Sequence, residues 1–354
     1  MIKTEMINRR DFLRRTGTLV VGGSLLTVFP PACSTWRDSP LVKRKFMAMG
    51  SFVEFTVIEK NKKLALDAID SAMAVFRQVD NLMSIYKSES EISDVNRKAG
   101  IEDVKVAGEF MEVVQKSLEF SIESKGVFDI TVLPLIDLWG FRDKKNLHVP
   151  DKKLIEYALE GVGYTKVKPN PSAGTIGLTS KNTSIDVGGI GVGYTVDKAI
   201  SVMKEKGIQR VIINAGGDIY VMGTPEGENG WLIGIQDPLR NNKIVASIRL
   251  KDCAIATSGN YEDYVELDGH RFGHIFNPKE GAPSESILSS TIVAKTCIEA
   301  DALSTTTFVM GSKEGVAFTD ARLNTECVLI TSSMQSGKQY EYACSSGLKD
   351  FNIL

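Results

Sequence analysis

The chain has 354 residues, 43% hydrophobic and 24% charged, which is enough to bury the core of one large domain or of two modest lobes. The formal net charge of −2 argues against a nucleic-acid-binding protein, because such a surface needs clustered Lys and Arg. The sequence contains neither a repeat of fixed period nor a segment biased enough to be called disordered, which excludes repeat architectures.

Residues 1–33 are predicted to be an export signal. Residues 8–14 contain paired arginines, then Phe-Leu and another basic residue, and the weakly apolar run 18–29 follows. This pattern resembles a twin-arginine signal, with a plain amphipathic helix as the alternative. Cys33 stands where a lipoprotein cysteine would, so we expect an exported protein tethered to the periplasmic face of the inner membrane. Cleavage near Cys33 by a simple signal peptidase is the rival interpretation.

The order of elements in the rest of the chain favours an α+β fold. Residues 34–44 are polar and predict a tether. Helices are predicted over residues 64–82, 108–125, 151–160, 193–206 and 298–310, with a further helix and two strands after the last. Strands are predicted over 52–57, 184–187, 210–214, 219–223, 231–236, 245–250 and 254–258. Helices come first and strands then follow one another, which fits α+β better than a doubly wound parallel sheet.

Four cysteines follow Cys33, and no two of them form a CxxC pair or a zinc-like spacing. They are Cys253, Cys297, Cys327 and Cys344. We interpret them as small buried residues, with one disulfide as an alternative in an oxidising compartment.

Two glycine-rich segments join predicted elements. Residues 185–194 place four glycines between a strand and a helix, where backbone N–H groups could approach a phosphate. No G-x-G-x-x-G register is satisfied, so a tight structural turn explains the segment equally well. Residues 213–218 place adjacent glycines between two strands, which favours a bend or bulge in which Asp218 fixes the turn.

Two further places in the sequence carry side chains that could bind a metal ion or act as a base. Asp301 and Thr305 are four residues apart and therefore share one helix face, where Mg²⁺ could take oxygen ligands. An acid near a helix start followed by Ser and Thr also fits helix capping. His274 follows the polar hairpin 264–271 and is either structural or a general base near neutral pH, without an accompanying catalytic triad.

Taken in order, these segments resemble the ApbE family, the FAD:protein FMN transferases, over residues 45–330. The segments are Met49-Gly50-Ser51; Met83-Ser84-Ile85-Tyr86 with Ser90-Glu91-Ile92-Ser93 and Asn96; Gly126-Val127-Phe128-Asp129-Ile130-Thr131 with Pro134-Leu135 and Leu138-Trp139-Gly140-Phe141; Ile185-Asp186-Val187-Gly188-Gly189-Ile190; Asn214-Ala215-Gly216-Gly217-Asp218; Ala256-Thr257-Ser258-Gly259-Asn260-Tyr261; His274-Ile275-Phe276-Asn277-Pro278; and Ala300-Asp301-Ala302-Leu303-Ser304-Thr305. Each segment alone is a weak signal, whereas the ordered series is specific.

The resemblance implies one T-fold-like α+β domain over residues 45–354, with two lobes and an FAD cleft between them. It implies that FAD is lined by Met49, Tyr86, Val127, Phe128, Asp129, Asp186, Val192 and Ile275. It also implies a Mg²⁺ held by the backbone carbonyl of Gly189 with Asp301, Thr305 and Ser304.

The implied reaction is a Mg²⁺-dependent transfer of FMN from FAD to a Thr or Ser hydroxyl of an acceptor flavoprotein of a redox system, with release of AMP. In this reaction His274 and Asp301 are the candidate catalytic residues. The alternatives are a Mg²⁺-dependent FAD pyrophosphatase and a non-catalytic periplasmic flavin-binding protein. The chain departs from the family pattern at Val192, where members often have Lys or Glu, and at Glu280, where Thr is usual; we expect Glu280 to face solvent.

Overall fold

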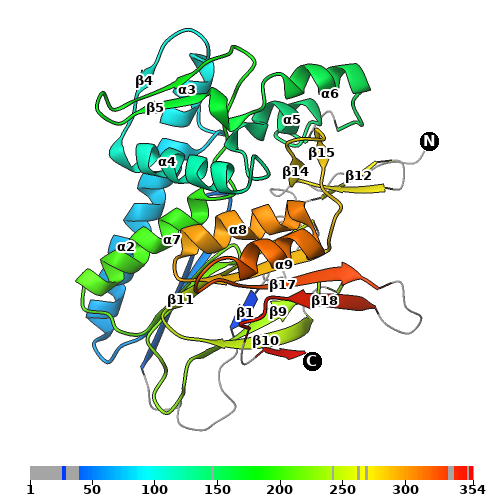
Figure 1. The fold of residues 1–354 in the computed structure, drawn as a ribbon. Helices are drawn as coiled ribbons and strands as arrows, with labels where there is room; N and C mark the ends of the chain where they lie inside the picture. The colour runs from blue at the N-terminus through cyan, green and yellow to red at the C-terminus, as the bar shows by residue number, and fades with distance from the viewer. Residues whose placement is uncertain are drawn as a thin grey trace, which may run out of the picture.

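The computed structural model describes residues 26–28, 40–144, 147–240, 243–260, 264–267, 270–333, 339–348 and 351–353. These residues form the predicted α+β fold, in which helices cover one face of a large sheet and a smaller sheet covers the other (Figure 1). The covering helices are α2 (Lys62–Met83), α7 (Gly191–Glu205), α8 (Cys297–Met310) and α9 (Ser312–Asp320). One hydrophobic cluster fills the space beneath the helices, and a second fills the space between the sheets.

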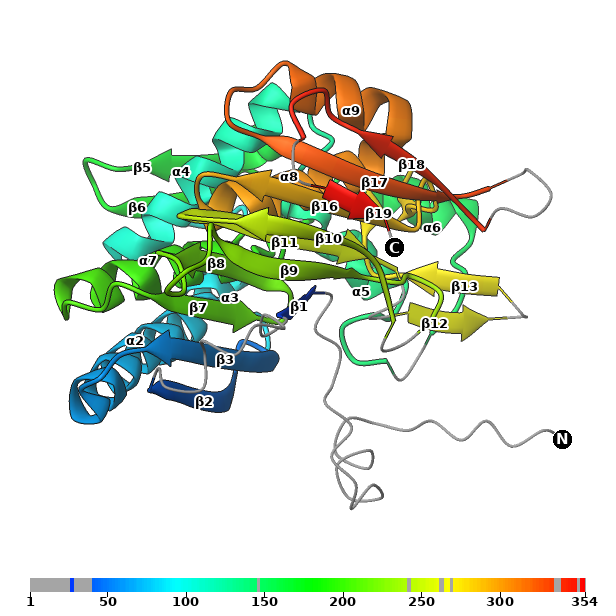
Figure 2. The ribbon, with the colours of Figure 1, turned by 90° about the horizontal axis from the view of Figure 1, so that it is seen from below.

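The large sheet has eight described strands, and every neighbouring pair in it is antiparallel (Figure 2). Across the sheet they are β18 (Tyr340–Cys344), β17 (Glu326–Ser332), β16 (Ser289–Ala294), β11 (Cys253–Gly259), β8 (Asp218–Met222), β7 (Val211–Ala215), β3 (Ser51–Ile58) and β2 (Leu41–Ala48). The smaller sheet runs β1 (Leu26–Val28), β9 (Trp231–Gln236), β10 (Ile244–Leu250) and β19 (Phe351–Ile353). Because successive strand residues point to opposite faces, Ile213 packs beneath the helices while Ile212 packs against the smaller sheet.

The two long N-terminal helices begin and end as their sequences predict. Helix α2 starts after Asn61, whose side-chain oxygen accepts a hydrogen bond from the Leu64 N–H at 3.1 Å. Its buried side chains recur at the helical spacing found in the sequence: Ala65, Ala68, Ile69, Ala72, Phe76 and Val79. Helix α4 (Gly108–Glu123) is followed by Gly126, whose φ of +78° lets its N–H reach the carbonyl of Ser121 at 2.7 Å.

The smaller elements lie around one end of these layers (Figure 1). They are α3 (Glu91–Arg97), α5 (Leu133–Leu138), α6 (Lys152–Leu159), β4 (Val104–Lys105), β5 (Val167–Asn170), β6 (Thr175–Leu178), β12 (Tyr264–Leu267), β13 (His270–Gly273), β14 (Phe276–Asn277) and β15 (Ala282–Pro283). A third hydrophobic cluster joins α5 and α6 to the hairpins β12–β13 and β14–β15. A Cβ on Gly281, which has φ of +72°, would lie 2.5 Å from Ile155 Cγ2, so α6 packs there only against glycine.

Three sequence predictions are wrong in detail. Residues 184–187 form no strand, because Ile185 pairs with a side chain: its N–H donates to Asn96 Oδ1 at 2.7 Å and its carbonyl accepts from Nδ2 at 2.9 Å. Residues 41–44, predicted as tether, begin β2 because they pair with β3. Helix α9 is followed by three described strands, β17, β18 and β19, rather than by two.

Most of the predicted export signal lies outside the described residues, and so does Cys33. The exception is Leu26–Val28, which pairs with β9 as strand β1. None of the described helices is both long and apolar enough to cross a bilayer. The export signal and the lipid anchor therefore remain predictions.

Candidate active site

The glycine-rich segment before α7 is held in place from two sides. Asn96 brackets Ile185 as described above, and the next residue donates its N–H to the carbonyl of Ile130 at 2.8 Å. That residue is Asp186, whose Oδ1 accepts the N–H of Gly188 at 3.0 Å. The segment is thus extended without being a strand, because its partners are the side chain of Asn96 and the carbonyl of Ile130 rather than a neighbouring strand. This arrangement presents Gly189 and the first turn of α7 toward α8.

Helices α7 and α8 approach so closely that their contact requires glycine. A Cβ on Gly193 would lie 2.4 Å from the Cys297 carbonyl oxygen and 2.7 Å from Asp301 Cβ. At this contact the Gly193 N–H donates to Asp301 Oδ2 at 2.9 Å. Asp301 therefore does not cap its own helix, as the sequence allowed, but satisfies an N–H in the first turn of α7.

The second acidic group at this place is Asp218. The glycines Gly216 and Gly217, with φ of +66° and +110°, form the two-residue turn between β7 and β8 and place Asp218 at the start of β8. Its side chain is hydrogen-bonded to Asp301. The sequence assigned Asp218 only a turn role, so the tertiary structure adds it to the candidate site.

Burial raises the pKa of Asp301 to about 7, and the negative charge of Asp197 adds to the increase. The hydrogen bonds from Gly193 and Asp218 oppose it. Two carboxyl groups at hydrogen-bond distance share a proton or require a cation. The pair is therefore suited to hold positive charge.

Three hydroxyl groups continue the site along α8. Ser258 Oγ of β11 lies 2.8 Å from Ser304 Oγ and 3.3 Å from Thr305 Oγ1. Thr305 Oγ1 faces the glycine segment, because a Cβ added to Gly189 would lie 3.3 Å from it. The four predicted metal ligands therefore lie along one seam between the glycine segment and α8. Ser258 was missed as a site residue, although it belongs to a segment that carries the resemblance.

Two of the apolar residues predicted to line FAD, Met49 and Phe128, lie against the same segment. Met49 lies in the turn between β2 and β3, and its Cε is 3.9 Å from the position of a Cβ on Gly191. Phe128 Cε2 is 3.5 Å from the corresponding position on Gly189. Ile275 belongs to the large hydrophobic cluster beneath the helices, and Val127 and Val192 pack against that cluster.

Two predicted FAD residues have other surroundings. Tyr86 is 72% exposed beyond the end of α2. Asp129 is buried, and its oxygens accept hydrogen bonds from the N–H and hydroxyl of Thr131 and from the N–H of Tyr164. A contact from Asp129 to FAD would have to compete with these bonds. At the departure from the family pattern, Glu280 is exposed, as predicted.

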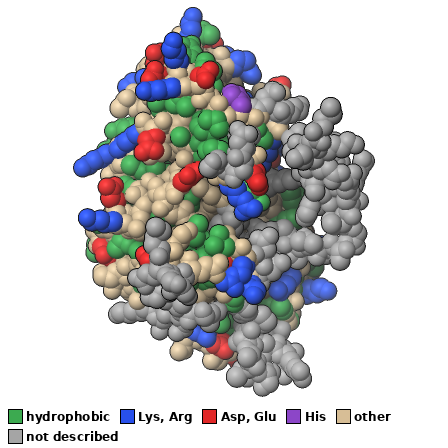
Figure 3. Space-filling model, turned by 90° about the vertical axis from the view of Figure 1, so that its right-hand side faces the viewer, with side chains coloured by type: hydrophobic (Ala, Val, Ile, Leu, Met, Phe, Trp, Pro, Cys, Tyr) green, Lys and Arg blue, Asp and Glu red, His purple; other side chains and the backbone are tan. Residues whose placement is uncertain are grey.

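Two basic side chains, Arg142 and His274, lie near Asp186. Burial raises the pKa of Asp186, while the Gly188 N–H, the charge of Arg142 and the nearby His274 act in the opposite direction. Arg142 also forms an ion pair with Asp137, whose Oδ1 lies 2.7 Å from Arg142 Nε. His274 is exposed and therefore accessible beside the glycine segment. On the face shown in Figure 3, the described side chains likewise mix acidic, basic and apolar groups.

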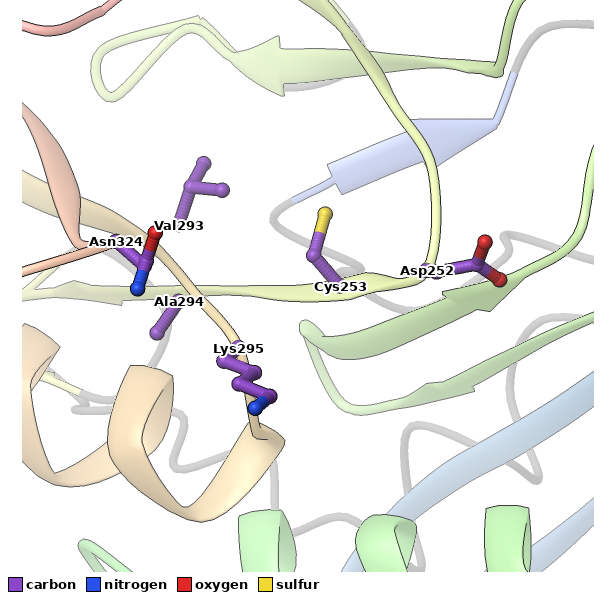
Figure 4. Close-up of a pocket in the computed structure, with 6 residues that line it drawn as sticks. All are labelled: Asp252, Cys253, Val293, Ala294, Lys295 and Asn324. Carbon is purple, nitrogen blue, oxygen red and sulfur yellow. The ribbon is translucent and has the colours of Figure 1, made fainter.

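A shallow cavity of about 320 Å³ lies elsewhere, where β11 begins and β16 ends. Its lining residues are Asp252, Cys253, Val293, Ala294, Lys295 and Asn324. Figure 4 shows Cys253 and Val293 pointing to one side of the strands and Lys295 to the other. Burial raises the pKa of the Cys253 thiol to about 11, so it is unreactive near neutral pH. None of the predicted site residues lines this cavity. All four described cysteines are free; Cys297 and Cys327 are buried as predicted, whereas Cys253 and Cys344 are only partly buried.

Comparisons with known proteins identify the family and the fold of the chain. The model of the ApbE family matches residues 49–329. The chain is similar to the FAD:protein FMN transferases of Salmonella typhimurium (30% identical over 75% of this chain and 77% of that protein) and Vibrio cholerae (31%, over 77% and 81%). Among solved structures it is similar to an ApbE protein of Thermotoga maritima (TM-score 0.78, 29% identical, covering 86% and 97%) and to the flavin transferase ApbE of V. cholerae (0.77, 25%, 87% and 98%). These matches confirm the predicted fold.

Proposed function

The chain belongs to the ApbE family, and on this basis we propose that it transfers FMN from FAD to a Thr or Ser hydroxyl of an acceptor protein. AMP is the other product. The observation that carries the proposal is the seam between α8 and the glycine segment, where Thr305 faces Gly189 and Asp301 bonds Gly193. An acceptor redox flavoprotein is the proposed partner.

The proposed metal is Mg²⁺, held by the carbonyl of Gly189, the carboxylate of Asp301 and the hydroxyls of Ser304 and Thr305. The donors fit this ion because all are oxygens, which Mg²⁺ prefers, and water completes its shell. The described residues contain no group of three or more His, Cys, Asp or Glu side chains that could hold a metal, so hydroxyl and carbonyl oxygens have to contribute. The close contact between Asp218 and Asp301 further supports a cation here. When bound, Mg²⁺ neutralises charge on the pyrophosphate of FAD and on the leaving AMP.

FAD is proposed to lie against the glycine segment. Met49 and Phe128 flank Gly191 and Gly189 and offer sulfur and aromatic surfaces to the flavin or adenine ring. Val192 supplies an apolar contact in place of the polar side chain that family members often carry. Asp186 can accept hydrogen bonds from ribose hydroxyl or flavin N–H groups once its contact with Gly188 is shared.

The transfer is a displacement at the FMN-side phosphorus. The acceptor hydroxyl oxygen forms the new P–O bond, while the bond from that phosphorus to the bridging oxygen breaks and AMP leaves with the bridging oxygen. The proton of the hydroxyl has to go to a base, and His274 is our candidate because it is exposed and lies near Asp186. The product is a phosphodiester-linked flavin.

The purified chain tests this function when it is incubated with FAD, Mg²⁺ and a Thr-containing acceptor. AMP release and acceptor mass are then followed together. AMP with an acceptor that gains the mass of FMN supports transfer. AMP with free FMN supports the pyrophosphatase, and intact bound FAD supports a flavin-binding protein; either result contradicts the transferase.

Export and the anchor at Cys33 are proposals as well, and loss of membrane association in Cys33→Ala tests the anchor.

A further inference from the structure

Helices α7 and α8 cap each other. On one side, the Gly193 N–H of α7 donates to Asp301 Oδ2 of α8 at 2.9 Å. On the other, the Cys297 N–H and the Ile298 N–H of α8 donate to Asp197 Oδ1 and Oδ2 of α7, at 2.8 and 2.9 Å. In α7 the aspartate lies four residues after Gly193, and in α8 it lies four residues after Cys297 and three after Ile298, so the two contacts are about one helical turn apart. The arrangement is reciprocal.

Neither helix has a local side-chain cap that would make this exchange redundant. Ile190 precedes α7 and provides no side-chain hydrogen bond to the first turn. Thr296 precedes α8, but its hydroxyl donates to Glu299 Oε2 at 2.8 Å and makes no capping bond to the backbone. The N–H groups of a first helical turn have no partner within the helix, and burying them unpaired is unfavourable. Each helix therefore depends on the aspartate of the other.

We propose that Asp197 is a positioning residue for the Mg²⁺ site, because its cap on α8 fixes where Asp301 stands relative to the glycine segment. This inference rests on the proposed function. Asp301 is one turn along α8 from Cys297, so a shift of the first turn moves the Asp301 carboxylate directly. The missing Cβ of Gly193 leaves the helices in direct contact, so little slack remains to absorb such a shift. Residues that orient metal ligands in this way affect metal affinity without touching the ion.

The charges around Asp197 agree with this role. Burial raises the pKa of Asp197 to about 6, the hydrogen bonds from Ile298 and Cys297 oppose the increase, Glu299 adds to it and Lys204 opposes it. With a pKa of about 6 the carboxyl group is mostly ionised at pH 7, and each of its two oxygens accepts one N–H of α8. An amide would offer only one acceptor oxygen.

The test uses the purified chain and three variants. Asp197→Ala removes both acceptors, and Asp197→Asn keeps one. Tyr194→Phe is the matched control, because Tyr194 is on the same helix and donates an interhelical hydrogen bond of 2.9 Å to Glu112 of α4 rather than to α8. Mn²⁺ is titrated by electron paramagnetic resonance in the absence of FAD, and hydrogen exchange is followed at the Gly193 amide.

We expect Asp197→Ala to weaken Mn²⁺ binding about tenfold or more and Asp197→Asn to weaken it less, while Tyr194→Phe stays within about twofold of wild type. Exchange at the Gly193 amide, which Asp197 does not bond, should accelerate in Asp197→Ala only. Unchanged Mn²⁺ affinity in Asp197→Ala, or an equal loss in Tyr194→Phe, overturns the positioning role alone. A wild-type chain that binds no Mn²⁺ overturns the proposed metal site and the positioning role together.

Discussion

The carboxyl groups of Asp218 and Asp301 are hydrogen-bonded to each other, although one begins a strand and the other lies inside a helix. Burial raises the pKa of Asp301 to about 7 although the hydrogen bond from Asp218 opposes the increase, so a site that is acidic in composition holds less negative charge than its residues suggest. A divalent cation bound there would keep both groups ionised.

Asp301→Asn separates the two roles of this residue. The amide oxygen can still accept the Gly193 N–H, so we expect stability within about 1 kcal/mol of wild type. Loss of the carboxylate should lower Mg²⁺-dependent AMP release at least about 100-fold. Asp301→Ala should lose both, with about 1–3 kcal/mol of destabilisation. Turnover with FAD and urea unfolding measure the two effects, and unchanged turnover in either variant would remove Asp301 from the metal site.

Gly193→Ala should destabilise the protein, because the new methyl group would overlap the Cys297 carbonyl at 2.4 Å. We expect the free energy of unfolding to fall by about 2–4 kcal/mol. Gly108→Ala is the control, since it adds a methyl group at the first position of α4 with nothing within 4 Å. Urea unfolding of both variants gives the comparison. Equal stabilities would contradict the close packing of α7 on α8.

Ser258→Ala should weaken the metal site without disrupting the sheet. It removes the hydroxyl that contacts Ser304 and Thr305, so we expect Mg²⁺ affinity to fall by about tenfold. Thr257→Val is the control, because the adjacent hydroxyl pairs with Thr291 at 2.8 Å and not with α8. That control should lose about 1 kcal/mol of stability and keep its Mg²⁺ affinity. Isothermal titration calorimetry measures the Mg²⁺ affinity of both variants. If only Thr257→Val bound Mg²⁺ more weakly, Ser258 would not support the metal site.

The stability of the protein should depend on pH through Asp197. Its pKa is raised from 3.8 to about 6, so between these values the native state binds more protons than the unfolded state. This contribution to stability is present below pH 3.8 and is lost as the pH rises through 6. Relative to Asp197→Asn, wild type should therefore lose about 2.4 kcal/mol of unfolding free energy between pH 4 and pH 7.

Urea unfolding of wild type and Asp197→Asn at several pH values measures that difference, because groups common to both chains cancel. A difference that is flat or that rises with pH would contradict the raised pKa. At pH 7 the same variant is expected to bind Mn²⁺ more weakly than wild type.

Several parts of the fold could be predicted from local sequence. The helix α2, the Gly126 cap and strand β9 follow from periodicity and glycine chemistry, which act within a few residues. Residues 184–187 were predicted wrongly because their alternating apolar pattern fits a strand, whereas their hydrogen-bond partner is the Asn96 side chain. No local pattern identifies that partner.

The same division holds for the site. The sequence determined which groups are available: its ordered motifs identified the family, and the four-residue spacing of Asp301 and Thr305 put both on one helix face. Only the tertiary structure decided that Asp218 pairs with Asp301, that Ser258 contacts Thr305 and that Asp197 caps α8. Each of these contacts joins elements distant in sequence, and their geometry depends on how closely α7 and α8 pack. That distance is set by side-chain volume and by the missing Cβ of Gly193, which act only once the chain has folded.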